Sequence, residues 1–140
     1  MKVFLGGTCN NSTWRDELMP KLDAIGVEYF NPVVPEWTEA AQKIEREQRE
    51  KCDYCLYVIT PAMTGVYSIA EVIDDSNKRP EKTLFLFLEK DLHMQFTPHQ
   101  IKSLKATGAM VLANGGTYLT NMEALIQFLL LAKKGQLMLS

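Results

Sequence analysis

The stretch that decides the fold is DYCLYVIT, residues 53–60. It is rich in aromatic and β-branched residues, which is typical of a strand buried in the centre of a parallel sheet. Residues 38–51, which precede it, are mostly polar and charged and predict an exposed helix. Residues 68–77, which follow it, predict a second helix. This helix–strand–helix order indicates an α/β protein.

The same alternation continues on both sides of this stretch. Short apolar segments at residues 2–5, 27–30, 83–88 and 109–112 predict four more strands, with helices between them. Because consecutive βα units are joined by right-handed crossovers, the strands should form one parallel sheet with helices on both faces. We expect about five strands in the order 2-1-3-4-5, in one domain that covers residues 1–140.

The last third of the chain carries weaker signals. Residues 90–98 are expected to be irregular, residues 100–106 to form a short helix, and Asn114-Gly115-Gly116 to form a turn. Thr120 or Asn121 is expected to cap a final helix that ends near Lys134.

Composition and charge exclude several classes of protein. The chain has 46% hydrophobic and 23% charged residues, as soluble globular proteins do. Its net charge of −2 offers no basic surplus for a nucleic-acid polymer. No segment is long and apolar enough for a membrane span, and three cysteines without a signal peptide favour reduced thiols. We therefore expect a cytoplasmic protein with no membrane partner.

The predicted topology points to two loops before any chemistry is considered. In such sheets the ligand lies beyond the carboxyl ends of the strands, near the switch point between the first and third strands. The loops there are residues 6–13 and 60–71. The first begins with Gly6-Gly7-Thr8, where backbone N–H groups and a following helix could hold a phosphate, a carboxylate or sugar hydroxyls. The alternative is a tight turn with no ligand.

Acidic residues are the better candidates for chemistry. Glu71 lies early in the helix after the central strand, where desolvation and dipoles can tune it as a base or nucleophile. The alternative is a surface glutamate favoured by the helix dipole. Asp53 opens the central strand and is usually a turn residue at the opposite end from the site.

The cysteines and aromatic residues are weaker candidates. Cys52 and Cys55 have C-x-x-C spacing, but three residues apart in a strand places side chains on opposite faces and no second pair exists. We therefore expect no metal and no cofactor. A flat base or sugar could stack on one of four aromatic residues, although each could equally be a packing residue: Trp14, Trp37, Tyr67 and Tyr118.

Taken together, several motifs resemble the nucleoside 2-deoxyribosyltransferase family, and in particular its small deoxyribosyltransferase-like branch. They are KVFLGGT, WRDEL, FNP, DYCLYVITP and YSIAEV, and the resemblance covers residues 2–88. It implies a flavodoxin-like α/β domain that cleaves the N-glycosidic bond of a deoxynucleoside through a deoxyribosyl-enzyme intermediate. It makes Glu71 the nucleophile, places Gly6, Gly7 and Thr8 against the nucleoside, and matches Asp53 to an acidic position.

The chain departs from the family pattern at one position. The transferases have an aspartate six residues before the nucleophile, which matches Gly65 here. The family also completes each site with a residue from a neighbouring subunit, and Asn114, Tyr118 or Asn121 could supply it. The final helix is apolar around much of its circumference, so it is either a core helix under the sheet or a subunit interface. The interface fits the oligomers that the family forms, and we therefore expect a homo-oligomer.

These observations leave three functional hypotheses. The first is N-glycosidic bond cleavage or deoxyribosyl transfer on a deoxynucleoside or its 5′-monophosphate, with Glu71 and Asp53 as catalytic residues. The predicted substrate-binding residues are Gly6, Gly7, Thr8, Trp14, Gly65, Tyr67 and Asn121. The second is a catalytically impaired nucleotide-binding or sensor protein that keeps the fold. The third is a glycosidase that acts on a dinucleotide such as NAD.

Overall fold

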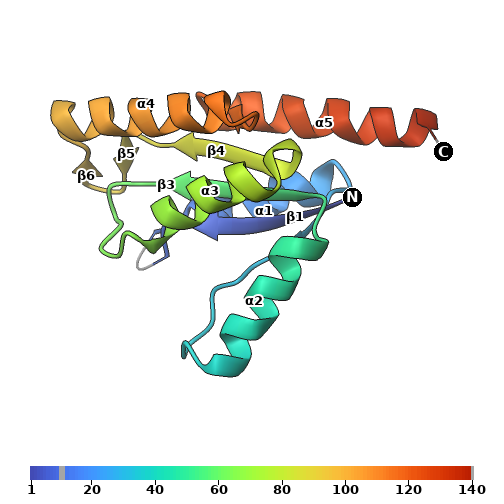
Figure 1. Cartoon of the computed structure of the whole chain (residues 1–140), viewed down its shortest axis with the longest axis horizontal. Helices are drawn as coiled ribbons and strands as arrows, with labels where there is room; N and C mark the ends of the chain where they lie inside the picture. The colour runs from blue at the N-terminus through green and yellow to red at the C-terminus, as the bar shows by residue number, and fades with distance from the viewer. Residues whose placement is uncertain (10–11, 140) are drawn as a thin grey trace.

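The computed structural model describes residues 1–9 and 12–139, and its centre is a five-stranded parallel sheet. Its strand order is β2-β1-β3-β4-β7, which confirms the predicted order and the flavodoxin-like doubly wound fold. Figure 1 labels its three longest strands, β1, β3 and β4. The strands are β1 (Lys2–Gly7), β2 (Glu28–Phe30), β3 (Tyr54–Ile59), β4 (Thr83–Phe87) and β7 (Thr117–Tyr118). Residues 53–60, which predicted a central strand, do form the middle of the sheet.

Helices cover both faces of the sheet because the side chains of each strand alternate between them. Val3 and Leu5 of β1 belong to one core layer, which also holds buried residues of α1 (Trp14–Ala24) and α5 (Met122–Leu139). Phe4 belongs to the other layer, with buried residues of α3 (Tyr67–Lys78) and α4 (Pro98–Ala113). A short 3₁₀ helix, η1 (Pro80–Lys82), leads from α3 into β4.

The remaining helix, α2 (Glu39–Lys51), projects from the body of the domain (Figure 1). The Thr38 hydroxyl caps it by accepting the N–H of Ala41 at 3.1 Å. Arg49 is its buried residue, and most of its other side chains are exposed. The predicted exposed helix at residues 38–51 is therefore confirmed. Its buried residue Arg49 joins it to Asp75 of α3.

Two predictions for the last third of the chain are wrong. Residues 109–112 are the end of α4, because the Thr97–Gln100 capping box starts a helix whose buried face continues through Leu104, Gly108 and Val111. The fifth strand of the sheet is β7 instead. Residues 90–98, expected to be irregular, contain a two-stranded antiparallel hairpin of β5 (Lys90–Asp91) and β6 (Met94–Gln95).

The segment Gly6-Gly7-Thr8, called the glycine segment below, also differs in detail from its prediction. Gly6 and Gly7 end the strand β1 and pair with Tyr57 and Val58 of β3, whereas the sequence predicted a turn at both glycines. Asn10 and Asn11, which belong to the predicted loop, lie outside the described residues. In the part of the chain that the structure describes, no helix combines the length and the apolar character needed to cross a membrane.

Candidate active site at the carboxyl edge of the sheet

Glu71 lies one turn into α3, and its side chain is largely buried. The residue is 8% exposed and lies on the wall of a cavity of about 550 Å³. Five of the predicted site residues line this cavity together, namely Gly6, Gly7, Gly65, Tyr67 and Glu71. Thr8 lines a smaller neighbouring cavity of about 270 Å³ with Gly7, Gly65 and Tyr67. The two loops that the topology pointed to therefore do meet at one site.

Three other predicted site residues lie elsewhere. Trp14 is 2% exposed, packs in the core, and donates its indole N–H to the carbonyl oxygen of Thr8 at 2.8 Å. Its ring is therefore not available to stack on a ligand. Asp53 lies before the amino end of β3, where its carboxylate accepts the N–H of Lys2 at 2.7 Å. Asn121 accepts the N–H of Ala124 at 2.7 Å and so caps α5.

A second glutamate, which the sequence did not single out, lines the same cavity beside Glu71. Glu45 of α2 is within side-chain hydrogen-bonding reach of Glu71. Burial, followed by the negative charge of Glu45, raises the pKa of Glu71 to about 8. Burial also raises the pKa of Glu45, while its hydrogen bond with Glu71 works in the opposite direction. The pair therefore holds one proton near neutral pH, and this proton resides mainly on Glu71.

Arg49 lies one turn after Glu45 in α2 and contacts one member of the Glu45–Glu71 carboxyl pair. Its Nη1 is 3.5 Å from Oε2 of Glu71, and its Nη2 donates to Oδ1 of Asp75 at 2.7 Å. Burial alone would lower the pKa of Arg49, but its hydrogen bond with Asp75 and the surrounding negative charges raise it. Arg49 therefore stays charged, and it lines a cavity together with Glu45 and Glu71.

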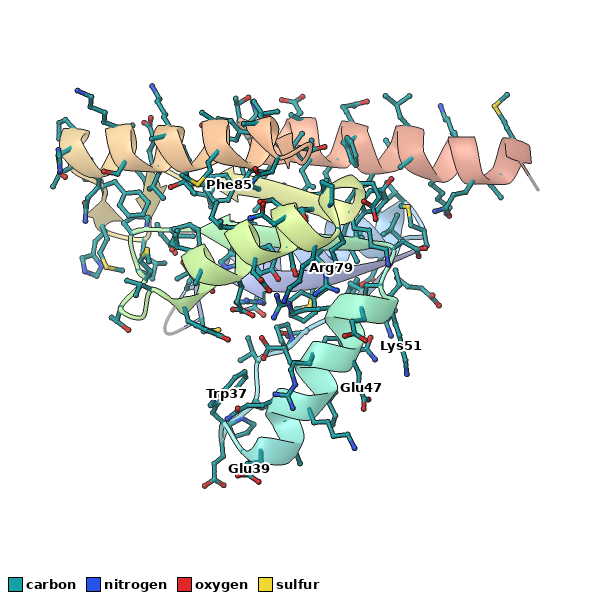
Figure 2. The ribbon with its side chains drawn as sticks, in the orientation of Figure 1. Trp37, Glu39, Glu47, Lys51, Arg79 and Phe85 are labelled. Atoms are coloured by element: carbon teal, nitrogen blue, oxygen red, sulfur yellow. The ribbon has the colours of Figure 1, made fainter. Side chains whose placement is uncertain are left out.

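Asp75 is the fully buried anchor of this network. Besides Arg49, it accepts hydrogen bonds from the hydroxyl of Tyr57 and from Nε of Arg79, the latter at 2.9 Å. Arg79 lies between α3 and the carboxyl end of α2 (Figure 2). Because Asp75 of α3 binds Arg49 of α2 and Tyr57 of β3, it fixes the carboxyl end of α2, and with it Glu45, against the sheet.

Arg15 holds the end of β1 and the glycine segment through hydrogen bonds to their backbone. It is 5% exposed and donates hydrogen bonds to the carbonyl oxygens of Leu5, Thr8 and Gly7, at 2.9, 2.6 and 3.2 Å. Burial lowers its pKa, and the charge of Glu45 is among the effects that oppose this shift. Because Arg15 also lines the large cavity, it contributes positive charge opposite the glutamates.

The two glycines are required by the sheet itself. Gly7 has φ of 117°, and a Cβ there would lie 2.0 Å from the carbonyl oxygen of Val58. A Cβ at Gly6 would lie 2.7 Å from the ring of Tyr57. The glycines therefore let β1 and β3 pair closely at the edge of the cavity, which is a structural reason independent of any ligand.

Two exposed aromatic rings stand at the mouth of the site. Tyr67 is 67% exposed and Trp37 is 53% exposed, and both line the large cavity. Trp37 lies beside the amino end of α2, near Glu39 (Figure 2). Both rings also line a second lobe of about 330 Å³, which opens onto Glu45 and Glu71 as well. The large cavity and this second lobe therefore share the Glu45–Glu71 carboxyl pair as part of their walls.

The cysteines do not form a metal site. Cys52 and Cys55 are buried in the same core layer, which corrects the prediction of opposite faces, because Cys52 precedes the strand. Burial raises the pKa of the Cys55 thiol to about 12. Within residues 1–9 and 12–139, no group of three or more His, Cys, Asp or Glu residues is placed to hold a metal ion.

Comparison with known proteins gives one match. A family model described as nucleoside 2-deoxyribosyltransferase like matches residues 1–80, which include the glycine segment, α2 and α3. No curated protein and no solved structure matches the chain. The matched region is more than half of the 140 residues and contains Glu45, Arg49 and Glu71. The chain therefore belongs to the nucleoside 2-deoxyribosyltransferase-like family.

Proposed function

We propose that the protein cleaves the N-glycosidic bond of a deoxynucleoside or its 5′-monophosphate, with Glu71 as the nucleophile. One observation carries this proposal above the others: Glu71 and Glu45 line the same cavity at the carboxyl edge of the sheet, where burial and the negative charge of Glu45 raise the pKa of Glu71 to about 8. Two carboxyl groups of which one is protonated are what glycoside cleavage requires, because one attacks carbon while the other protonates the leaving group.

The roles of the two glutamates follow from this shared proton. As the C1′–N bond breaks, an oxygen of the Glu71 carboxylate bonds to C1′ and the electron pair of the broken bond goes to the base nitrogen. The shared proton, then on Glu45, passes to that nitrogen. In the second half, Glu45 removes a proton from water or from a second base, which attacks C1′ and releases Glu71. Charge and protons balance over the cycle.

Arg49 suits this chemistry because its charge is permanent. When the proton leaves Glu71, the guanidinium 3.5 Å away stabilises the carboxylate that forms. In this proposal Glu45 takes the place of the acid that the family resemblance assigns to the position of Gly65. Asp53, our other predicted catalytic residue, is not part of the proposed mechanism because it bonds to Lys2 before the amino end of β3.

The cavities suit a nucleoside in size and chemistry. Small-molecule sites usually have volumes of about 300–1,000 Å³, and the two lobes measure about 550 and 330 Å³. Trp37 and Tyr67 present aromatic faces on which a nucleobase can stack. The proposed partner is thus a small molecule.

Three free cysteines agree with a reducing compartment, and we propose a cytoplasmic location on that ground.

Product analysis tests the proposal directly. Deoxynucleosides and their 5′-monophosphates are incubated with the protein, with and without a second free base, and separated by chromatography. Base release in water indicates a hydrolase, and exchange that needs the second base indicates a transferase. Glu71→Gln should abolish both reactions, since an amide cannot attack C1′, and Glu47→Gln on the exposed side of α2 is the matched control. Full activity in Glu71→Gln would refute the nucleophile assignment.

A second variant separates the acid from the nucleophile. Glu45→Gln should slow release of a neutral base by about 10²–10⁴-fold, the usual contribution of a general acid. It should affect 7-methyl-2′-deoxyguanosine far less, because that base leaves without protonation. Equal losses on both substrates would show that Glu45 is not the acid.

Gly65 favours a second candidate, a nucleotide-binding protein without catalysis. The position that carries an acid in the transferases has no side chain here, and a Cβ built on it meets no atom within 4 Å. Retention of an unchanged nucleotide, with no base released from any substrate, would support this candidate over the enzyme.

A further inference from the structure

The β5–β6 hairpin lies outside the residues that the family model matches, yet it reaches the proposed site. It turns through Leu92, which has φ of 55°, and pairs Lys90 with Gln95 and Asp91 with Met94. Its base is closed by the N–H of Phe96, which donates to the carbonyl oxygen of Glu89 at 2.9 Å. The hairpin is thus an ordered element that the matched residues 1–80 do not include.

The side chain of Asp91 connects this hairpin to both loops of the site. Asp91 is 9% exposed, and its Oδ2 accepts the hydroxyl of Ser12 at 2.5 Å and the hydroxyl of Thr60 at 2.6 Å. Ser12 lies between the glycine segment and α1, and Thr60 follows β3 directly. A buried carboxylate that accepts two short hydrogen bonds ties its donors more strongly than a neutral acceptor does.

The same two loops are also joined to each other. The N–H of Thr60 donates to the hydroxyl oxygen of Thr8 at 2.9 Å, and the N–H of Thr8 donates to the carbonyl oxygen of Val58 at 2.9 Å. Gly7, Thr8 and Cys9 line one side of the smaller cavity, and Gly65, Tyr67 and Ser68 line the other. The spacing of these two sides therefore depends on a network that Asp91 closes.

We propose that Asp91 is a positioning residue, which holds the glycine segment and the β3–α3 loop at the separation that the substrate requires. It would act on the site through Ser12 and Thr60, without contact with the reacting atoms. The inference rests on the proposed function for its kinetic consequence, although the effect on the two loops can be measured without any substrate.

The test compares Asp91→Ala with Asp91→Asn, which keeps an oxygen that can accept both hydroxyls. In Asp91→Ala we expect KM to rise about tenfold, with kcat within about threefold of wild type because Glu71 and Glu45 are held by Arg49 and Asp75 instead. Asp91→Asn should recover part of the loss, because its neutral oxygen accepts the same hydroxyls more weakly than the carboxylate does. An equal loss in both variants, or a loss confined to kcat, would overturn the proposal.

Hydrogen exchange provides the second measurement. Amides of residues 6–9 and 59–68 should exchange faster in Asp91→Ala than in Asp91→Asn, while those of β2 should not change. Faster exchange confined to residues 89–96 would mean that Asp91 only stabilises its own hairpin, and would overturn the proposal. If wild type cleaves no substrate, the proposed function fails and the exchange of these loops alone decides the role of Asp91.

Variants of the two donors guard against a misfolded Asp91→Ala. Thr60→Val removes the hydroxyl that donates to Asp91 and also accepts the N–H of Ala62 at 3.2 Å, and Thr60→Ser is its matched control because serine keeps both bonds. Ser12→Ala removes the other hydroxyl. Each should speed exchange in the loop that loses its bond, and wild-type exchange in both variants would overturn the proposal.

Discussion

The guanidinium of Arg49 lies 3.5 Å from the carboxyl of Glu71, and yet the pKa of Glu71 is raised to about 8. A neighbouring cation ordinarily lowers the pKa of an acid. Here burial and the negative charge of Glu45 outweigh Arg49, part of whose charge is already neutralised by Asp75. The carboxyl that is proposed to attack the substrate is therefore mostly protonated in the free protein near neutral pH.

This raised pKa has a consequence for stability. Between about pH 4.5 and pH 8 the folded protein holds a proton on Glu71 that the unfolded chain has released, so stability falls as the pH rises through this window. The loss in the free energy of unfolding should reach a few kcal/mol by pH 8. Glu71→Gln, which resembles the protonated form, should lack this loss. Urea unfolding of both proteins at pH 5, 6.5 and 8 measures the difference, and parallel pH profiles would contradict the shift.

The pH dependence of activity should reflect the protonation of the same two carboxyl groups. Cleavage needs one proton on the Glu45–Glu71 pair, so kcat/KM should fall as the pH rises above about 8. On 7-methyl-2′-deoxyguanosine, whose base leaves without protonation, only the carboxylate form of Glu71 is needed, so kcat/KM should rise as the pH rises through about 8. In Glu45→Gln this rise should move to lower pH, because the like charge that raises the pKa of Glu71 is removed. Initial rates between pH 5 and 10 on both kinds of substrate measure these profiles, and an unmoved rise in Glu45→Gln would argue against the coupling of the two glutamates.

Restoring an acid at Gly65 should increase activity. The space around a Cβ at this position is open, so Gly65→Asp fits without a clash. We expect kcat/KM to rise by at least about tenfold, since a positioned acid can contribute about 10²–10⁴-fold. Gly65→Asn is the control of equal size that carries no exchangeable carboxyl proton. Equal rates in the two variants would mean that a carboxyl there has no catalytic role.

Gly7 should tolerate no side chain. Gly7→Ala places a Cβ 2.0 Å from the Val58 carbonyl oxygen at a φ of 117°, and should lower the free energy of unfolding by about 2–4 kcal/mol. Gly65→Ala, which meets no neighbour, is the matched control and should change stability by less than about 1 kcal/mol. Denaturant unfolding compares them, and similar midpoints would show that β1 can separate from β3 at little cost.

The homo-oligomer remains a prediction that the final helix makes testable. Leu131, Leu137 and Met138 of α5 are 67%, 66% and 87% exposed, although Leu125 and Leu129 near the start of the same helix are buried in the core. Sedimentation at micromolar concentration should show a species larger than the monomer, and Leu131→Lys should dissociate it. Lys134→Glu, on the same helix, is a control for altered charge. A monomer for wild type would refute the prediction.

The sequence determined the alternation of strands and helices, because apolar runs and glycines are local signals. Residues 53–60 are rich in aromatic and β-branched residues, which predicted a central strand, and β1, β2 and β4 followed from the same reasoning. The strand expected at residues 109–112 was wrong because a short apolar run fits a buried helix end equally well. The helix that begins at the Thr97–Gln100 capping box buries Val111 along with Leu104 and Gly108, and so it takes up these residues. Glu71 could be singled out because it lies early in the helix after that strand.

The other residues of the site could be identified only from contacts between distant segments of the folded chain. Glu45 lies among several glutamates of a charged helix, and nothing local separates it from Glu47 or Glu50. It is selected because Arg49, one turn on, is drawn into the interior by Asp75. Asp91 likewise lies in a polar segment with no local signal that marks it. Its role is visible only from the hydrogen bonds that Ser12 and Thr60, both distant in the sequence, donate to it. A carboxyl group acquires its pKa and its partners from charges and burial that segments distant in the sequence supply, and therefore from the folded protein alone.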